Sequence, residues 1–454
     1  MPALVYAALS TAIVSSLGML LVPSISQAMD VSISTAQWML TLNLLVGAIA
    51  TPVMGRLSDG PHKKRLLVWS LVIILIGSVV AATATNFTVF LIGRALQGLT
   101  YGIVPVTIAL ARRYLAAHKV QSSISSLSVT VSTGIGIGYP LTGIIAGLVD
   151  YRFAFWFAAV FVVTAIVVVL RIVPAGPDEL APRVPFDYSG ASLLALGLGA
   201  LLLGVSEGPN WGWASVWTIG TCVVAVVILG IWARAELRSR HPLVNLRVLR
   251  NGDVLLANAT AIGLGAAMYL GLSVSSLIAQ APIETGYGIA LPLFWAGFVM
   301  FPLSVGSFSA NRLVRRLSHR IRLATLLPIG AAMMTASALL LWFAHDELWE
   351  VLIGMLVLGL GMGTSYAAMP ALIARSVATA ELGSSVSFNQ VLRTVGSSFG
   401  TAVSGAVLAV HMGADRHPTD AGISMVLAIG ALVGVVVFVA LLIHFVVTRS
   451  RANP

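Results

Sequence analysis

The sequence predicts an all-α membrane protein of about fourteen transmembrane helices, arranged as two pseudo-symmetric six-helix bundles with a central helix pair. Three observations support this prediction. Of the 454 residues, 58% are hydrophobic and only 9% are charged, which is too little charge to cover a soluble protein of this size. The apolar stretches are long and continuous, whereas the strands of a membrane barrel would alternate over roughly ten residues. Short patterns of the first half also recur in the second half at matching spacings.

The first bundle is assigned to residues 1–175. Its spans are runs of roughly 20 or more mainly apolar residues, the length that crosses a bilayer. Short polar segments, such as the basic loop that contains Lys63 and Lys64, separate them. In order, the six spans cover 4–27, 36–55, 65–85, 87–111, 121–149 and 152–173.

A linker and the central helix pair are assigned to residues 176–250. Four prolines mark the linker, and proline disrupts helices: Pro174, Pro177, Pro182 and Pro185. The pair covers 188–207 and 214–234, and a basic connector from Arg234 to Arg250 follows it. The second bundle, 251–454, holds the last six spans, at 252–281, 287–311, 322–344, 347–375, 385–411 and 421–446.

The basic residues fix the expected orientation. If the N-terminus lies in the cytoplasm, Arg152 and Arg416 fall outside and Arg94 and Arg393 fall within spans, while the rest of the 26 lysines and arginines lie on the cytoplasmic side. Cytoplasmic loops are enriched in these residues. We therefore expect an integral protein of the cytoplasmic (plasma) membrane with both termini cytoplasmic and a retained first span. The formal charge of +10 then reflects topology and does not indicate a nucleic-acid partner.

Two patterns suggest a duplicated bundle. One joins a glycine, a tyrosine and a proline, as Gly98, Tyr101 and Pro105 in the fourth span and as Gly363, Tyr366 and Pro370 in the twelfth. The other joins three glycines, as Gly134, Gly138 and Gly143 in the fifth span and as Gly396, Gly400 and Gly405 in the thirteenth. Small residues at such intervals let helices approach closely, and parallel repeats that enclose a midplane site are typical of secondary transporters.

Two arginines lie within predicted spans. An arginine in a membrane helix is costly unless it faces water, a partner or a ligand. Arg94 shares a helical face with Gln97 and Tyr101, and no mid-span carboxylate is available to pair with it. Bonding to carbonyl groups and contact with substrate both remain open for Arg94 and for Arg393. The candidate cavity residues are Arg94, Gln97, Tyr101, Asn43, Asn258, Tyr366, Asn389 and Arg393.

Several stretches resemble motifs of the major facilitator superfamily, specifically its fourteen-span drug:proton antiporter branch. Gly55 to Asp59 with Lys63 to Arg65 is similar to the loop motif between the second and third spans. Arg94 to Gly98 resembles the fourth-span motif, and Gly134 to Gly143 resembles the antiporter motif of the fifth span. Pro242 to Asn251 is similar to the connector before the ninth span. The likeness covers nearly the whole chain.

The resemblance implies a gate at the cytoplasmic end. Asp59 ends the second span, and the thirteenth span begins on the same side near Gly383, so the positive end of that helix could face the carboxylate and latch the gate. The alternative is that Asp59 only orients a solvated loop. The candidate gate and motif residues are Gly55, Asp59, Arg65, Arg112, Arg113, Gly134, Gly138, Pro140 and Gly143.

The proton site departs from the family pattern. Many proton-coupled exporters carry an acidic residue inside the bundle, often in the first span, but all 16 carboxylates of this chain fall in loops or near span ends. The candidate proton sites are therefore Glu207, Glu284 and Asp59. A carrier that is not driven by protons is the alternative.

The expected function is secondary active export of amphipathic small molecules, of the multidrug-efflux kind associated with antibiotic resistance, by alternating access and with proton antiport. A lipid or glycolipid exporter on the same fold is the alternative. The sequence contains no HExxH motif and no phosphate-binding loop, so we expect no enzymatic activity, metal or cofactor. The expected partners are a small-molecule substrate, a coupling ion and membrane lipids, with the chain acting as a monomer.

Overall fold

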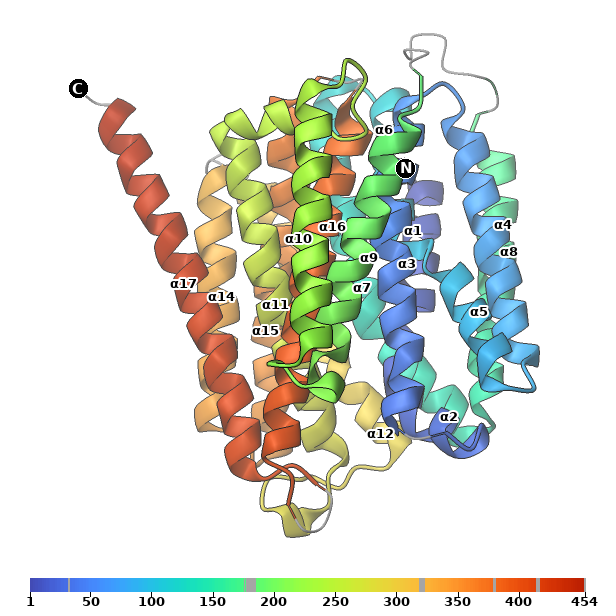
Figure 1. Cartoon of the computed structure of the whole chain (residues 1–454), viewed down its shortest axis with the longest axis vertical. Coiled ribbons are helices and arrows are strands. Elements are labelled where there is room, and N and C mark those ends of the chain that lie inside the picture. Colours follow the sequence, from blue (N-terminus) through green and yellow to red (C-terminus); the bar gives the residue numbers. More distant parts are fainter. Residues whose placement is uncertain are drawn as a thin grey trace.

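The structure is a computed structural model that describes residues 1–31, 33–174, 176, 185–317, 323–378, 381–413 and 417–452. Long helices lie side by side along one axis of the molecule (Figure 1). Within the described ranges the chain forms helices and turns, and its only bridge pairs Met412 with Pro418. The predicted all-α class is confirmed. Pro177, Pro182, Arg183, Arg320, Arg322 and Arg416, which the sequence places in loops, lie outside the described residues.

The helices of the first half run up to the proline-rich loop. They are α1 (Pro2–Ser16), η1 (Met19–Leu21), α2 (Val22–Ala28), α3 (Ile33–Asp59), α4 (Lys63–Thr83), α5 (Phe87–Gln97), α6 (Thr100–Tyr114), α7 (Ala117–Leu148) and α8 (Tyr151–Ile172). The central pair consists of α9 (Tyr188–Trp211) and α10 (Val216–Arg238), followed by η2 (Leu246–Arg250).

The second half begins directly after η2. Its helices are α11 (Gly252–Gln280), η3 (Ile283–Thr285), α12 (Leu293–Ala296), η4 (Gly297–Met300), α13 (Phe301–Leu317), α14 (Leu323–Phe343), α15 (Leu348–Ser376), α16 (Leu382–Val410) and α17 (Asp420–Ala452). The start of α1 and the end of α17 lie toward the same end of the bundle (Figure 1). We call this the inner end, because α3 also ends there at Asp59, and we call the opposite one the outer end.

Twelve helical stretches of the described chain are long and apolar enough to cross a membrane, so the predicted number of about fourteen is not confirmed. The expected span 4–27 is interrupted, because α1 ends at Ser16 and the short η1 and α2 follow it. The expected span 385–411 corresponds to α16, which is long enough at 29 residues but carries many polar side chains. These side chains are buried between helices rather than exposed on the surface, so apolar composition alone underestimates such a helix.

The two halves contact each other along two seams. At the first seam α3 packs against α16, and at the second α7 packs against α13, α15 and η4. The repeated glycines lie at equivalent contacts within the halves. A Cβ atom on Gly134 or Gly138 would meet Ala12 or Ser16 of α1, and one on Gly396 would meet Ile262 of α11. Close approach without a side chain therefore joins α7 to α1 and α16 to α11 in the same way.

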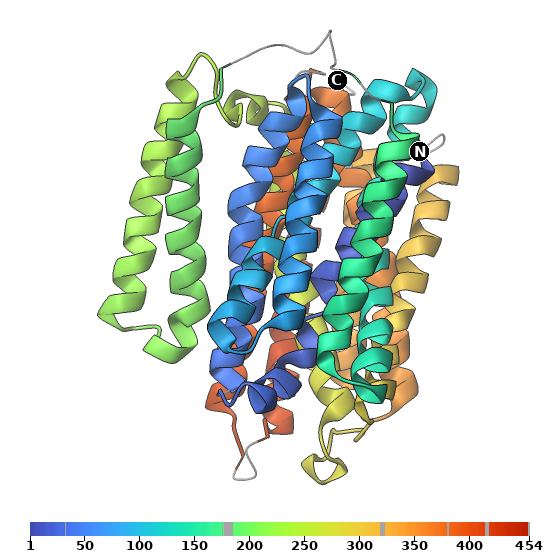
Figure 2. The ribbon, with the colours of Figure 1, turned by 90° about the vertical axis from the view of Figure 1, so that its right-hand side faces the viewer.

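The central pair covers the seam between α3 and α16. Figure 2 shows α9 and α10, in green, as a hairpin at the edge of the bundle. Leu194 and Leu198 of α9 form one buried cluster with Ala48 of α3 and Val391 of α16. The segment after α10 completes this cover, because Asn245 donates a hydrogen bond of 2.9 Å to Glu381 at the start of α16.

A buried carboxylate fixes the end of this hairpin. Glu236 is 1% exposed and accepts hydrogen bonds from the Trp232 indole at 3.0 Å and from the Val244 amide at 3.4 Å. It thereby holds the chain after α10 against the helix. Trp232 in turn lies 6.1 Å from Phe388 of α16, measured between ring centroids.

We expect Glu236→Ala to lower the free energy of unfolding by about 2–4 kcal/mol, because two buried donors lose their acceptor. Thermal unfolding of the purified protein in detergent measures this change. Glu236→Gln keeps one acceptor oxygen and should lose less. Glu207→Ala is the control on the same hairpin, since Glu207 is only half-buried and bonds to the nearby Asn210. An equal loss in Glu236→Ala and Glu207→Ala would contradict this role.

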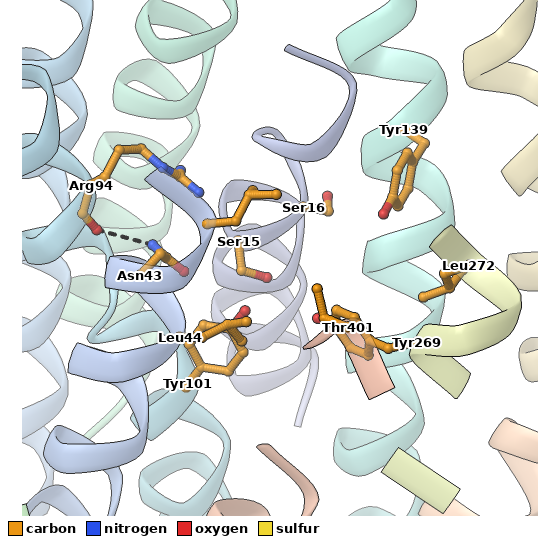
Figure 3. Close-up of a pocket in the computed structure, with 11 residues that line it drawn as sticks. Ser15, Ser16, Asn43, Leu44, Arg94, Tyr101, Tyr139, Tyr269, Leu272 and Thr401 are labelled. Carbon is orange, nitrogen blue, oxygen red and sulfur yellow. Dashed lines mark hydrogen bonds between the residues drawn. The ribbon is translucent and has the colours of Figure 1, made fainter. Parts of the chain in front are cut away.

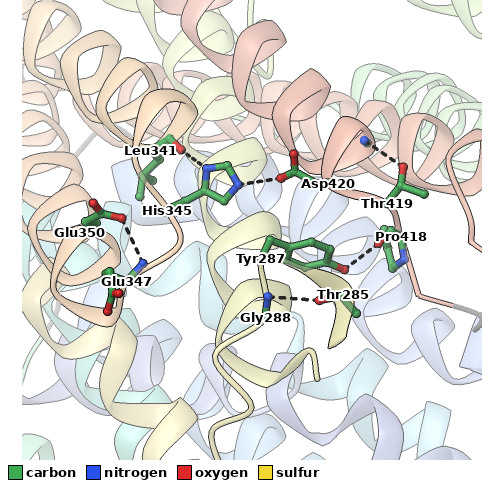
Figure 4. Close-up of polar contacts among 11 residues, drawn as sticks. Thr285, Tyr287, Gly288, Leu341, His345, Glu347, Glu350, Pro418, Thr419 and Asp420 are labelled. Carbon is green, nitrogen blue, oxygen red and sulfur yellow. Dashed lines mark hydrogen bonds and ion pairs between the residues drawn. The ribbon is translucent and has the colours of Figure 1, made fainter. Parts of the chain in front are cut away.

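Polar contacts join the loops at the outer end of the second half. His345 donates a hydrogen bond of 2.7 Å from Nδ1 to the Leu341 carbonyl, and its Nε2 lies 3.1 Å from a carboxylate oxygen of Asp420, which begins α17 (Figure 4). Tyr287 donates a hydrogen bond of 2.8 Å to the carbonyl of Pro418 (Figure 4). These contacts fasten the helices of this half to one another at a distance from the seams.

Candidate functional site

A cavity lies between the two halves at the middle of the bundle, and both halves contribute to its wall (Figure 3). The space free of atoms there, including space that is open to solvent, amounts to about 540 Å³. Its lining consists of Ser15, Ser16, Leu40, Asn43, Leu44, Arg94, Tyr101 and Tyr139 from the first half and Tyr269, Leu272 and Thr401 from the second.

Two helices are interrupted beside this cavity. α1 ends at Ser16, and its last two residues, Ser15 and Ser16, both line the cavity. The fourth expected span divides into α5 and α6 at Gly98 and Leu99, where hydrogen bonds over three residues replace those of an α-helix. Interrupted helices near the bilayer midplane are common at the binding sites of secondary transporters, because they expose backbone groups that a continuous helix would use.

Arg94 lies in the wall and is 0% exposed. Its Nη1 donates a hydrogen bond of 2.6 Å to Gln97, and its Nε donates a long one of 3.4 Å to the carbonyl of Met39. The guanidinium carbon also lies 5.9 Å from the centre of the Phe155 ring. Figure 3 shows the guanidinium group directed from α5 toward the space beside Ser16. Among the described residues, Arg94 has no ion-pair partner.

The other predicted cavity residues fall into two groups. Asn43 and Tyr101 line the cavity, and Asn43 donates a hydrogen bond of 3.0 Å to the carbonyl of Arg94. Five residues do not reach the lining: Gln97, Asn258, Tyr366, Asn389 and Arg393. Their side chains instead connect neighbouring residues and helices.

Each of these five has an identifiable partner. Gln97 donates a hydrogen bond of 2.9 Å to Ser78 of α4 and thereby presents its oxygen to Arg94. Asn389 of α16 donates to Asn258 of α11 at 3.0 Å. The guanidinium carbon of Arg393 lies 4.0 Å above the ring of Tyr366, which is a cation–π contact.

Sequence reasoning missed several lining residues, above all Tyr139 and Tyr269. Tyr139 stands inside the glycine pattern of the fifth span, so its position beside Pro140 was the available signal. Tyr269 stands in an apolar span without any pattern around it. Tyr101 of α6 and Tyr269 of α11 both line the cavity, one from each half. Only the spatial arrangement of α6 and α11 reveals this pair.

The inner end of the α3–α16 seam is closed by Asp59. This carboxylate is 6% exposed and accepts hydrogen bonds from the backbone amides of Gly383 at 2.7 Å and Ser384 at 3.0 Å. These are among the first amides of α16, which have no partner within the helix and lie at its positive end. The predicted contact between Asp59 and the start of this helix is present.

Glycines make this contact possible. A Cβ atom on Gly55 would lie 2.8 Å from the carbonyl oxygen of Gly383, and one on Gly383 would lie 2.6 Å from the carbonyl oxygen of Gly55. The two helices therefore cross backbone to backbone. Any larger side chain at either position would move Asp59 away from the amides that it accepts from.

The three arginines predicted for the gate occupy different surroundings. Arg112, on the last turn of α6, interacts electrostatically with Asp59. Arg113 contacts the ring of Tyr114 at 4.7 Å. Arg65 is exposed at the start of α4 and lines a wide surface cleft, with about 1360 Å³ of empty volume, that extends from Asp59 to Phe186.

The outer end of the second seam is closed by the fifth-span glycines. A Cβ atom on Gly143 would lie 2.9 Å from the carbonyl oxygen of Leu293 and 3.2 Å from the Cα atom of Gly297. Conversely, a Cβ atom on Gly297 would lie 3.2 Å from the Cα atom of Pro140. The matching glycine of the repeat, Gly405, has no atom within 4 Å of such a Cβ. The duplicated pattern thus has different surroundings at its outer end.

Neither of the two outer carboxylates proposed for proton binding lies at the cavity. Glu207 is half-buried on α9 and accepts a hydrogen bond of 3.1 Å from Asn210, while Glu284 is exposed in η3. No carboxylate belongs to the cavity lining. Within the described ranges, His, Cys, Asp and Glu side chains form no group that could hold a metal ion.

The sequence matches the family model described as Major Facilitator Superfamily over residues 3–401. The chain belongs to this superfamily. Members of this superfamily are transporters that bind small-molecule substrates, so the match points to a transporter rather than an enzyme. The match does not distinguish branches of the superfamily, so membership of the fourteen-span branch stays a prediction.

Named relatives are other superfamily transporters. The chain is 27% identical over 399 residues to the multidrug resistance protein Stp of Mycobacterium tuberculosis, which covers 87% of this chain and 73% of Stp. It is 27% identical over 375 residues to an uncharacterized MFS-type transporter of the same organism, covering 82% of this chain but only 53% of that relative, so the chain spans about half of its length.

Solved structures share the fold at low sequence identity. The human organic anion transporter MFSD10 (TETRAN) superposes with a TM-score of 0.67 at 15% identity and covers 96% of this chain and 98% of that one. A mutant of the nucleoside transporter NupG superposes with a TM-score of 0.61 at 13% identity and covers 98% of both chains.

Proposed function

We propose that this transporter exports amphipathic small molecules from the cytoplasm by alternating access, in the manner of multidrug efflux carriers. The observation that carries the proposal is a central cavity to which both halves contribute lining residues, with the Asp59 contact closing the inner end beyond it. Rocking of the halves about this cavity would open one end while it closes the other. Relatives named multidrug resistance proteins support the same function.

We also propose that α16 and the α1–α2 segment cross the membrane, which would give fourteen spans and the antiporter-branch topology. α16 is long enough to cross the membrane. Its polar residues are buried against α3 and α11, so they do not contact lipid and do not prevent it from spanning. Residues 1–175 and 251–454 would then be the moving halves of a monomer. The pair within 176–250 covers one seam.

The inner end would face the cytoplasm. Basic residues at helix ends, such as Arg56, Arg112 and Arg375, gather at the end that carries Asp59, the start of α1 and the end of α17. When the Asp59 contact is closed, the cavity would therefore be shut off from the cytoplasm.

For coupling, we propose that protons act through Asp59. Among the three candidates it alone is buried and joins the two halves. Ionised, it accepts charge-assisted hydrogen bonds that hold the inner end closed; protonated, it would accept more weakly and release α16. Such a carrier would open inward when protonated and return outward after releasing the proton to the cytoplasm.

Efflux from proteoliposomes tests the function. We expect the purified protein to move at least one amphipathic compound from a panel of dyes and drugs, and an imposed pH gradient should accelerate this movement severalfold. Liposomes without protein are the control. Flux that ignores the gradient would contradict antiport but leave export intact, whereas transport of phospholipid without transport of any panel compound would replace export of small molecules by lipid export.

A further inference from the structure

The charged side chain that lines the central cavity is positive. Arg94 is the charged residue of the lining, and the lining contains no carboxylate. A second guanidinium, that of Arg393, lies buried behind Tyr366 and within electrostatic range of Tyr101. The charges nearest to a bound molecule are therefore positive ones.

The partners of Arg94 leave this charge uncompensated. They are the neutral amide oxygen of Gln97, at 2.6 Å, and the carbonyl oxygen of Met39, at 3.4 Å. Gln97 is itself held by its hydrogen bond to Ser78, so its oxygen stays directed at the guanidinium. Neutral acceptors orient a guanidinium group but do not neutralise it, and burial strengthens its attraction for an anion.

The remaining wall suits a flat apolar body. Tyr101, Tyr139 and Tyr269 supply aromatic faces and hydroxyl groups, and leucines such as Leu44 and Leu272 supply apolar surface (Figure 3). Aromatic rings pack well against such faces, and phenols bond to the polar edges of a ligand. A cation would have to enter a space that holds an unpaired positive charge.

We propose that the cavity selects aromatic amphipathic molecules that carry a single carboxylate, with the carboxylate on Arg94 and the ring among the three tyrosines. This inference rests on the proposed export function and names its substrate class. It separates this carrier from exporters that take lipophilic cations, for which a cavity carboxylate would be the appropriate partner.

Three probes of one shape but different charge test the inference: naphthylacetate, its neutral amide naphthylacetamide and naphthylethylammonium. Their binding to the purified, detergent-solubilised protein is measured by equilibrium dialysis, and their efflux from proteoliposomes is measured in parallel. We expect the acid to bind at least about tenfold more tightly than the amide, because only it forms a charge-assisted pair with a buried guanidinium, and we expect no measurable binding of the cation.

Variants at Arg94 locate the preference. Arg94→Gln should bind acid and amide equally within about twofold, and Arg94→Lys should retain part of the preference for the acid. Arg171→Gln, which makes the same exchange at an exposed position of α8, should match the unaltered protein. Size-exclusion chromatography and thermal unfolding show that each variant is folded.

The outcomes separate this inference from the proposed function. Three results would each overturn the substrate class: tighter binding of the cation, no binding of the acid, or a preference for the acid that persists in folded Arg94→Gln. Partial preference for the acid in Arg94→Lys would not rescue it. Export of other panel compounds would meanwhile uphold the exporter. Tight binding of the acid without efflux of any compound would uphold the site and overturn the export function.

Discussion

Asp59→Asn is expected to reduce transport by about tenfold or more while leaving folded protein in the membrane. The carboxylate accepts from two backbone amides of α16, at 2.7 and 3.0 Å. Asparagine keeps one acceptor oxygen, but its NH₂ group would face the second backbone amide of α16. Two hydrogen-bond donors would then face each other. The closed inner end should lose about 3 kcal/mol, which shifts the balance between closed and open inner ends about a hundredfold.

The shift from the closed to the open inner end can also be measured without a transport assay. Cys222 is the single cysteine of the chain, so a Cys222→Ser background allows one thiol to be placed in the cavity by Ser15→Cys. A membrane-impermeant maleimide should label this thiol faster from the inner side in Asp59→Asn than in the background protein. Asp253→Asn is the matched control, because that carboxylate is exposed in the first turn of α11 at the same end. Unchanged flux in Asp59→Asn would contradict the gate.

The position of Asp59 could be predicted from sequence because its reason is local. A carboxylate at the end of one helix can meet the glycine–serine start of another when both lie on the same side of the membrane. The positions of the basic residues predicted that both lie on the cytoplasmic side. The glycine repeat likewise indicated where α7 meets α1 and where α16 meets α11. These contacts follow from spacing along single helices and from topology.

The cavity wall was harder to predict because it depends on how helices turn toward one another. Asn389 shares a helical face with Arg393, yet it bonds to Asn258 and never reaches the cavity. Tyr269 looks like any tyrosine in an apolar span, although α11 brings it beside Tyr101. The polar residues of α16 mislead in another way: they are buried, and a count based on apolar composition omits their helix.

Gly143→Leu should hold the outer end of the second seam open and reduce transport by about tenfold, whereas Gly405→Leu should change it by less than about twofold. The Cβ atom at position 143 would crowd backbone atoms, the carbonyl oxygen of Leu293 and the Cα atom of Gly297, which no rotamer change can move. Forcing such contacts costs roughly 1–3 kcal/mol. Gly405 occupies the equivalent place in the repeat, but nothing lies within 4 Å of its Cβ position.

This pair of variants separates closure of a seam from a general need for small residues. In the Ser15→Cys, Cys222→Ser background, Gly143→Leu should speed labelling from the outer side, the opposite of the expectation for Asp59→Asn, and Gly405→Leu should leave labelling unchanged. Gly143→Ala is the milder step and should give an intermediate rate. Equal losses of transport at 143 and 405 would mean that the glycines serve helix packing throughout the membrane. Loss at 143 alone would mean that the fifth-span motif works where the two halves must meet and part.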